Sequence, residues 1–335
     1  MENPDSIFEL HPGRFEERAI QIFNQQFERI PVYREFTLQI GRNPQNIRKL
    51  EDIPYLPVQF FKTHKVIAPG KLPTKLIFES SGTTGAEVSR HYIENPEIYQ
   101  ESFNRSFQLF YGEVKKYCIL GLLPSYLERG ASSLVYMVDE LIRKSQNQLS
   151  GFYLNEYEQL YETLKTNEKN RQPALLIGVT YALLDFFERF PIPLQYTHII
   201  ETGGMKGRRK ELTRKEVHSL LKNCTGLACI HAEYGMTELL SQAWSECNGI
   251  FNCPPWMKVG IRAEDDPFDV HFSETLSEAK TGVVNVIDLA NINSCSFIAI
   301  DDLAKLYPDG SFEISGRLDH SDIRGCSLLY TGGLS

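Results

Sequence analysis

Between residues 116 and 232 the sequence alternates between short apolar segments and longer amphipathic ones. The segment 174–179 is apolar throughout, as a strand buried on both faces requires, and the amphipathic segments carry apolar residues at helical spacing. This alternation predicts a mainly parallel sheet with helices on its faces. We expect strands at 116–123, 151–154, 174–179, 197–201 and 227–232, and helices at 132–144, 156–166, 181–190 and 213–221.

The segments before this core predict helices and one extended stretch. Apolar residues at helical spacing predict a helix from Arg14 to Ile30 and another over 99–110. Two prolines in the segment 53–64 argue against a long helix there, so we expect an extended segment that borders a site. Lys62 and His64 lie in this extended segment. Either both face a site, or Lys62 is an ordinary surface residue and His64 a packed one.

From residue 258 onward the sequence has short β-like runs with turns between them, including a hairpin turn at 307–312. This pattern predicts an antiparallel subdomain packed against the main sheet. The chain therefore divides into an α/β core with an N-terminal helical cap over 1–257, a β subdomain over 258–316 and a tail over 317–335.

The composition narrows the class of protein. A chain of 335 residues with 42% hydrophobic and 23% charged residues is typical of a soluble globular protein, and its net charge of −8 argues against a broad nucleic-acid surface. We expect no signal peptide and no membrane span. Seven cysteines without a C-x-x-C pair favour a reducing cytoplasm over a disulfide framework. A zinc ion held by Cys247, Cys253 and Cys295 stays open, although no spacing rule requires it.

A loop of hydroxyl and glycine residues follows the apolar run at 76–78. Its two glycines can take positive φ, which lets the backbone aim several N–H groups at one point, and its four hydroxyls add donors suited to phosphate oxygens. It lacks the Gly-Lys-Ser/Thr of a Walker A loop and the glycine spacing of a Rossmann fingerprint. A solvated turn is the alternative. The residues are Ser80, Ser81, Gly82, Thr83, Thr84 and Gly85.

Two of the predicted strands end in residues suited to a flat ligand that carries phosphates. Bare glycine backbone lets a planar group lie close, an aromatic ring can stack on it, and a carboxylate can hold Mg²⁺ against phosphates. Ligands of parallel sheets bind at these carboxyl ends. A plain turn and a helix N-cap are the alternatives. The residues are Gly203 and Gly204 after one strand, and Tyr234, Gly235, Thr237 and Glu238 after the next.

The predicted β subdomain contributes two further candidates. Asp302 precedes the hairpin turn and Arg317 follows it. A carboxylate can accept hydrogen bonds from both hydroxyls of a ribose, and an arginine can face a phosphate or a ribose. The alternative is a turn that these two side chains stabilise.

These motifs, taken in order, resemble the adenylate-forming superfamily of acyl-CoA synthetases, luciferases and peptide-synthetase adenylation domains. The resemblance rests on the Ser80–Gly85 loop, Tyr-Gly-Met-Thr-Glu at 234–238, Asp302, and Gly-Arg-Leu-Asp at 316–319. It implies an α/β fold, the adenylate-forming large domain, with mainly parallel sheets flanked by helices and a small antiparallel β subdomain. The mobile C-terminal lysine domain of these enzymes is absent here or reduced to a tail.

One branch of the superfamily resembles this chain further, from about Ile53 onward. The short length, Phe60–His64, Cys253–Met257 and the Arg-Gly-Cys-Ser run at 324–327 are similar to the acyl-protein synthetase (LuxE) family, the long-chain-fatty-acid ligases of bacterial bioluminescence. This resemblance implies an enzyme that activates a long-chain fatty acid with ATP as an acyl-adenylate and transfers it to a protein cysteine as a thioester. The implied acceptor is a protein such as a fatty-acid reductase.

The resemblance also assigns roles to residues. The Ser80–Gly85 loop would grip the phosphates of ATP, Thr237 would contact the α-phosphate and Glu238 would hold Mg²⁺. Asp302 would bind the ribose hydroxyls with Arg317 close by. The residues that would border the adenine are Gly203, Gly204 and Tyr234 with the adjoining Gly235. The tail residue Cys326 would take the acyl group.

Two departures from the superfamily pattern affect this interpretation. Ala86 and Glu87 stand where most members have Pro-Lys after the loop. We also expect the domain that carries the catalytic lysine to be absent or reduced to a tail. Lys62 and Lys206 are the candidates for a replacing cation. Two other functions stay open: an acyl- or aryl-CoA ligase of the phenylacetate type, and a degenerate nucleotide-binding scaffold without activity.

Overall fold

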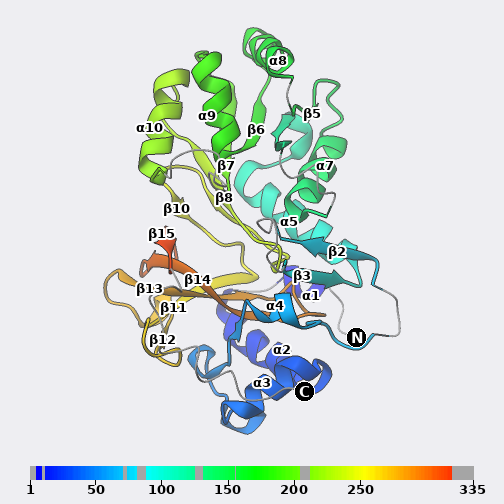
Figure 1. Cartoon of the computed structure of the whole chain (residues 1–335), viewed down its shortest axis with the longest axis vertical. Helices are drawn as coiled ribbons and strands as arrows, with labels where there is room; N and C mark the ends of the chain where they lie inside the picture. The colour runs from blue at the N-terminus through cyan, green and yellow to red at the C-terminus, as the bar shows by residue number, and fades with distance from the viewer. Residues whose placement is uncertain are drawn as a thin grey trace.

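The computed structural model describes residues 5–9, 12–70, 74–80, 88–124, 131–154, 156–203 and 212–318. Two large sheets dominate this part of the chain, one above the other in Figure 1, and a short hairpin adds β2 (Leu76–Glu79) and β3 (Arg90–Ile93).

The upper sheet has the strand order β5-β4-β6-β7-β8-β9, and its strands are parallel except for β9, which runs antiparallel to β8. Every residue of β4 and β6 is buried, which explains why these segments are almost continuously apolar. The strands are β4 (Cys118–Leu122), β5 (Gly151–Phe152), β6 (Ala174–Val179), β7 (Thr197–Thr202), β8 (His231–Tyr234) and β9 (Ala243–Ser245).

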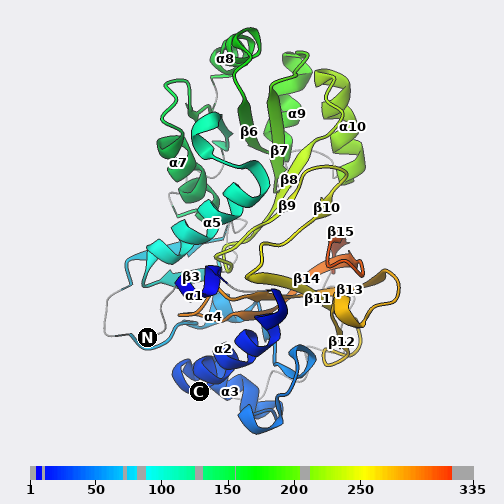
Figure 2. The same cartoon turned by 180° about the vertical axis from the view of Figure 1, so that it is seen from behind.

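Helices cover both faces of the upper sheet. In both views α9 and α10 lie on one side of it and α5 and α7 on the other (Figures 1 and 2). The predicted capping box is confirmed, because the hydroxyl of Thr213 accepts a hydrogen bond from the backbone N–H of Glu216, whose carboxylate accepts one from the backbone N–H of Thr213. The helices are α5 (Pro96–Tyr111), α7 (Ser133–Ser145), α8 (Tyr157–Asn170), α9 (Thr180–Arg189) and α10 (Arg214–Thr225).

The lower sheet has the order β10-β15-β14-β13-β11-β12, and β1 pairs with β14 in parallel while the other pairs are antiparallel. The predicted hairpin turn joins β14 to β15, with Gly310 at a φ of +87° that favours glycine. The strands are β1 (Leu56–Pro57), β10 (Ile250–Phe251), β11 (Met257–Arg262), β12 (Val270–His271), β13 (Lys280–Asp288), β14 (Phe297–Leu306) and β15 (Phe312–Arg317).

Of the four N-terminal helices, α2 and α3 lie below the lower sheet, and α1 and α4 lie level with it (Figure 2). The side-chain amide of Gln26 in α2 donates to the carbonyl of Asn291 at 2.9 Å and to the hydroxyl of Ser296 at 3.0 Å. These helices are α1 (Asp5–Phe8), α2 (Phe15–Arg29), α3 (Pro31–Gln39) and α4 (Phe60–Thr63). Single 3₁₀ turns occur at η1 (Pro12–Arg14), η2 (Pro44–Asn46), η3 (Leu50–Asp52), η4 (Val114–Lys116) and η5 (Ser273–Thr275).

Two predicted boundaries are wrong. The segment 53–64 is extended only at β1 and ends in the short helix α4, because its prolines precede that helix and leave its turn intact. The strand predicted at 227–232 begins only at His231, since Gly226, at a φ of +72°, ends α10 and the next residues return the chain to the sheet.

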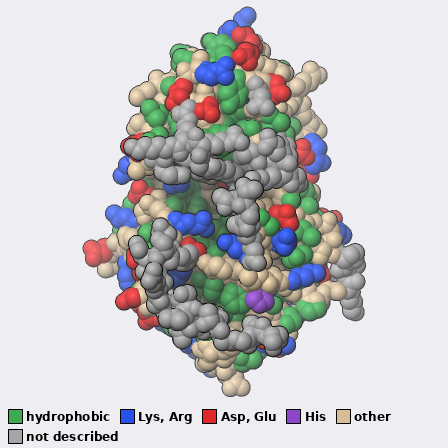
Figure 3. Space-filling model, viewed as in Figure 1, with side chains coloured by type: hydrophobic (Ala, Val, Ile, Leu, Met, Phe, Trp, Pro, Cys, Tyr) green, Lys and Arg blue, Asp and Glu red, His purple; other side chains and the backbone are tan. Residues whose placement is uncertain are grey.

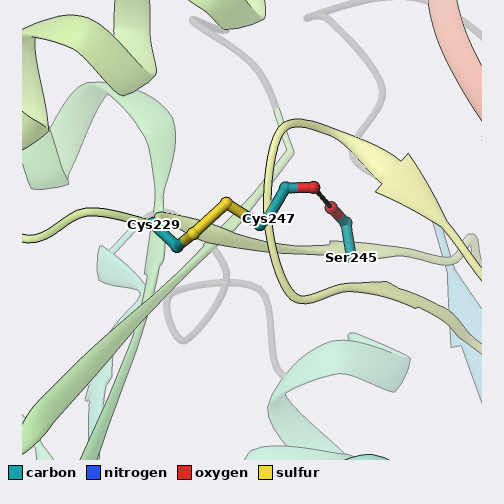
Figure 4. Close-up of a disulfide and its surroundings, with 3 residues drawn as sticks. All are labelled: Cys229, Ser245 and Cys247. Atoms are coloured by element: carbon teal, nitrogen blue, oxygen red, sulfur yellow. Dashed lines mark hydrogen bonds between the residues drawn. A yellow bond between two sulfur atoms is a disulfide. The ribbon is translucent and has the colours of Figure 1, made fainter.

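The prediction that the cysteines stay reduced is wrong for one pair. Cys229 and Cys247 form a disulfide, which joins the residues just before β8 to those just after β9 (Figure 4). The hydroxyl of Ser245 donates to the carbonyl of Cys247 at 3.1 Å. Cys247 is therefore unable to serve the suggested zinc site, and no cluster of metal-ligating side chains occurs among the described residues. The cytoplasmic location stays a prediction.

None of the helices in the described part of the chain is long and apolar enough to cross a membrane.

Candidate functional site

The two sheets meet where β8 ends. The hydroxyl of Tyr234, the last residue of β8, donates to the carboxylate of Asp302 in β14 at 2.8 Å. The tyrosine ring also lies 5.8 Å from the ring of Phe251 and 5.6 Å from that of Phe312, both in the lower sheet. Tyr234, predicted to stack on a flat ligand, and Asp302, predicted to bind a ribose, are thus adjacent. The face of the molecule drawn in Figure 3 is hollowed at mid-height, with charged side chains beside the hollow.

Asp302 has a second partner in Arg317, which is paired with it across β14 and β15. The guanidinium Nε lies 3.5 Å from Oδ1 of the carboxylate, and the arginine side chain is largely exposed. Burial raises the pKa of Asp302, although the hydrogen bond from Tyr234 and the charge of Arg317 oppose this rise. Burial and the neighbouring Asp302 raise the pKa of Tyr234, so the proton of their hydrogen bond stays on the tyrosine.

Three buried side chains hold the turn that follows β8. His91 of β3 donates from Nδ1 to the carbonyl of Thr237 at 2.9 Å, and the amide of Asn291 donates to the carbonyl of Glu238 at 2.8 Å. Asp288 accepts from the backbone N–H of Leu240 at 2.8 Å. The sequence reasoning missed these three residues, because nothing in their spacing shows that they reach this turn.

The tautomer of His91 follows from its partners. The carbonyl of Thr237 can only accept, so Nδ1 carries the proton, and Nε2 accepts from the hydroxyl of Ser294 at 2.8 Å. Burial lowers the pKa of His91 to about 4, which keeps the ring neutral. The neutral ring of His91 therefore links β3 to the 237–241 turn and to the loop after β13 through two hydrogen bonds.

Glu238 is buried and lies within electrostatic reach of two cations. Burial raises the pKa of its carboxyl group, while a hydrogen bond from Ser89 and the charges of Lys62 and Arg317 lower it. Lys62 is exposed on α4. The structure thus brings together Glu238, Lys62 and Arg317, which lie far apart in the sequence.

A network of hydrogen bonds and ion pairs surrounds Glu201 near the end of β7. The hydroxyl of Thr180 contacts the carboxylate of Glu201 and lies 3.1 Å from the carbonyl of Gly203, which has a φ of +76°. Arg214 lies 3.7 Å from Glu201, and His218 lies 3.8 Å from it. Burial alone would raise the pKa of Glu201, but His218, Arg214 and Thr180 outweigh it and hold this pKa low.

A second buried carboxylate lies at the end of β8. Glu233 accepts a hydrogen bond from the hydroxyl of Thr202 at 2.6 Å. Burial and the charge of Glu201 raise its pKa to about 7. A Cβ on Gly235 would lie 2.4 Å from the Glu233 carboxylate, so any larger residue here would have to displace that carboxylate. The sequence reasoning did not assign a role to Glu201 or Glu233, although both end apolar strands.

Only the base of the hydroxyl-rich loop is described. The backbone N–H of Ser80 donates to the carbonyl of Ser89 at 3.0 Å, and the hydroxyl of Ser80 accepts from the N–H of Ser89 at 2.9 Å. Ser89 itself contacts Glu238, so the two ends of the loop lie beside the candidate site. Eight predicted site residues lie outside the described residues: Ser81, Gly82, Thr83, Thr84, Gly85, Gly204, Lys206 and Cys326.

Neither a family model nor a curated protein matches this chain. Solved structures do match. ATP-bound MatB from Rhodopseudomonas palustris has a TM-score of 0.54 at 15% identity, over 75% of this chain and 49% of that chain. The Archaeoglobus fulgidus long-chain-fatty-acid-CoA ligase FadD1 has a TM-score of 0.50 at 13% identity, over 73% of this chain and 52% of that one.

The chain has the large-domain fold of adenylate-forming enzymes. The predicted fold class is thereby confirmed. The chain spans about half the length of these solved structures, and at this identity the likeness concerns the fold alone.

Proposed function

We propose that this protein activates a carboxylic acid with ATP as an acyl-adenylate and then transfers the acyl group to a thiol. The observation that carries the proposal is the hydrogen bond between Tyr234 and Asp302, which joins two motifs 68 residues apart at the carboxyl end of β8. An aromatic ring beside a carboxylate suits a nucleoside, since the ring can stack on the base and the carboxylate can accept from both ribose hydroxyls. The shared fold supports the same function.

The nucleotide would occupy the residues around this pair. Gly203 and Gly204 would border the adenine opposite Tyr234, and the Ser80–Gly85 loop would receive the phosphates. Thr237 would contact the α-phosphate, at a turn that buried hydrogen bonds already hold in place. Arg317 would lie near the ribose and phosphates.

A magnesium ion fits this donor set. Mg²⁺ is usually held by one or two carboxylates together with substrate phosphates, and Glu238 is one buried carboxylate in this position. When bound there, the ion would neutralise charge on the phosphates. The nearby Lys62 would add positive charge where the adenylate forms, and it remains our candidate, with Lys206, for the catalytic cation.

The chemistry needs charge stabilisation more than proton transfer. A carboxylate oxygen of the acid forms a bond to the α-phosphorus, and the bond from that phosphorus to pyrophosphate breaks. A thiolate then attacks the acyl carbon, and AMP leaves. We propose a long-chain fatty acid as substrate, the thiol of Cys326 as acceptor and a partner protein, such as a fatty-acid reductase, as final recipient.

The test of the first step is ATP–pyrophosphate exchange measured against a panel of carboxylic acids that includes fatty acids of graded length. Exchange that depends on one acid is expected. Absence of exchange with every acid, while nucleotide binds, would favour the inactive scaffold and overturn the proposal.

The second step is tested by Cys326→Ser. Because a hydroxyl is a far weaker nucleophile than a thiolate, we expect this variant to keep pyrophosphate exchange and to lose hydroxylamine-sensitive labelling by radioactive fatty acid. Cys224→Ser, at another free cysteine, is the control and should label normally. Labelling that survives in the Cys326 variant would remove this residue from the mechanism.

The second candidate function is acyl-CoA ligation, which the likeness to a solved long-chain-fatty-acid-CoA ligase favours. Steady turnover of free CoA to a thioester would support it against transfer to protein.

A further inference from the structure

A cavity of about 380 Å³ lies against the outer side of α10, apart from the Tyr234–Asp302 pair. Helix α10 supplies Arg214, Lys215, His218 and Lys222 to its lining, and β15 supplies Glu313. In both ribbon views α10 stands above β10 and β15 (Figures 1 and 2). The cavity thus lies between α10, the loop before β10 and β15, and it is open to solvent on one side.

The lining is positively charged in a protein of net charge −8. Three Lys and Arg side chains face one carboxylate, and positions 214, 218 and 222 fall on one side of the helix because they are four residues apart. A local excess of positive charge on an acidic protein attracts anions rather than cations.

The arginine of this cavity is held in place. Its guanidinium carbon lies 5.0 Å from the centre of the Phe251 ring, and Nη1 lies 3.4 Å from the carbonyl of Ile314. A Cβ on Gly249 would lie 3.0 Å from Cδ of Arg214, so the glycine leaves room for this path. His218 is 5% exposed and therefore fixed as well. Binding an anion here would cost little ordering of these two side chains.

We propose that this cavity binds a small organic phosphate monoester. Such a group carries close to two negative charges at neutral pH and offers three acceptor oxygens, which suit a guanidinium fork and ammonium groups. The volume exceeds that of a bare phosphate and lies in the range of small-molecule pockets. Glu313 can accept from hydroxyls on the organic part. The site is separate from the proposed adenylate chemistry.

The cavity is connected to the candidate nucleotide site through Arg214. This residue pairs with Glu201, whose partner Thr180 contacts Gly203, and its charge also acts on Asp302. An anion bound to Arg214 would compete with Glu201 for its charge. Any effect on nucleotide affinity would be reciprocal, because coupling between two binding sites is symmetric.

The test is isothermal titration calorimetry of the full chain with ribose 5-phosphate, and with ribose as the uncharged control. We expect binding with a dissociation constant of about 1 mM or below for the phosphate and no detectable heat for ribose. The double variant Lys215→Gln/Lys222→Gln should bind about tenfold more weakly or worse. Lys165→Gln/Lys169→Gln on α8 removes the same charge elsewhere and should bind as the wild type does.

Each contrary result overturns the proposal. Ribose 5-phosphate that binds no better than ribose, or that binds equally to the Lys215/Lys222 variant, shows that the cavity holds no phosphate. Saturating ATP that abolishes the binding in wild type and variants alike assigns the ligand to the nucleotide site instead. Because the measurement needs no catalysis, a failure of pyrophosphate exchange leaves its result intact.

Discussion

Three buried glutamates near the candidate site show how neighbouring groups modify the effect of burial on the pKa of a carboxyl group. Glu201 has Arg214 and His218 beside it and a lowered pKa, whereas Glu233 faces only a hydroxyl and the charge of Glu201 and has a raised one. The pKa of Glu238 is also raised, because the hydrogen bond from Ser89 and the charges of Lys62 and Arg317 only partly offset its burial. The sequence pattern alone does not show these differences in pKa.

The raised pKa of Glu233 predicts a pH dependence of stability. Its pKa rises from 4.5 to about 7 on folding, so the folded state binds more protons, and the resulting stability is complete below pH 4.5 and lost as pH rises through about 7. Glu233→Gln, which removes the titrating group, should lack this loss of up to roughly 3 kcal/mol. Urea unfolding at pH 5 and pH 8 measures it, with Glu278→Gln as an exposed control. Parallel pH profiles for wild type and Glu233→Gln would contradict the prediction.

Asp302→Ala tests the carboxylate at the centre of the candidate site. Loss of two charge-assisted hydrogen bonds to a ribose should weaken ATP binding by about tenfold or more. Calorimetric titration with ATP gives the affinity, and Asp265→Ala, at an exposed position in the loop after β11, serves as the control. An unchanged dissociation constant would exclude Asp302 from nucleotide binding.

At the scale of single elements, the β8–β9 hairpin carries most of the described site. Tyr234, Thr237 and Glu238 all lie between the two cysteines of the disulfide, which are 18 residues apart. Closing this loop covalently restricts the unfolded chain around these residues, and the buried contacts of His91 and Asp288 order it in the folded state.

Removal of this disulfide should lower stability. The double variant Cys229→Ser/Cys247→Ser should lose about 3 kcal/mol of unfolding free energy, the value expected for a loop of this length. Denaturant unfolding without reductant measures the loss, and treatment of the wild type with dithiothreitol should reproduce it. A variant as stable as the oxidised wild type would show that the bond restrains little.

At the scale of the whole molecule, the site depends on two sheets being held together. The upper sheet supplies Tyr234 and the lower one supplies Asp302, while α2 packs against the lower sheet through Gln26. Helix α2 thus supports the site without contributing a residue to it.

Gln26→Ala tests this support. The substitution leaves the backbone N–H of Ser296 without its partner in a buried setting and removes the packing of the Gln26 side chain, so we expect a loss of about 2–4 kcal/mol in unfolding free energy. Thermal and urea unfolding measure it. Gln21→Ala, on the exposed side of the same helix, should change stability by less than about 0.5 kcal/mol.

Local patterns in the sequence predicted most elements and the candidates themselves. The alternation of apolar and amphipathic segments predicted the parallel sheet, and the capping box predicted the start of α10. The motifs predicted Tyr234, Glu238 and Asp302 as site residues. The predictions of helices and strands succeed because helix periodicity, capping and strand burial depend on residues near one another in the chain.

Only the tertiary structure showed which residues meet. The Tyr234–Asp302 bond, the contact of His91 with Thr237, the disulfide and the cavity on α10 each join segments that no local spacing relates. The physical reason is that contacts between distant segments follow from how the sheets and helices pack. Burial and the neighbouring groups that packing brings together then decide the charge of each carboxylate. The sequence by itself thus determined most helices and strands, whereas the tertiary packing of the two sheets decided which residues lie together at the candidate site.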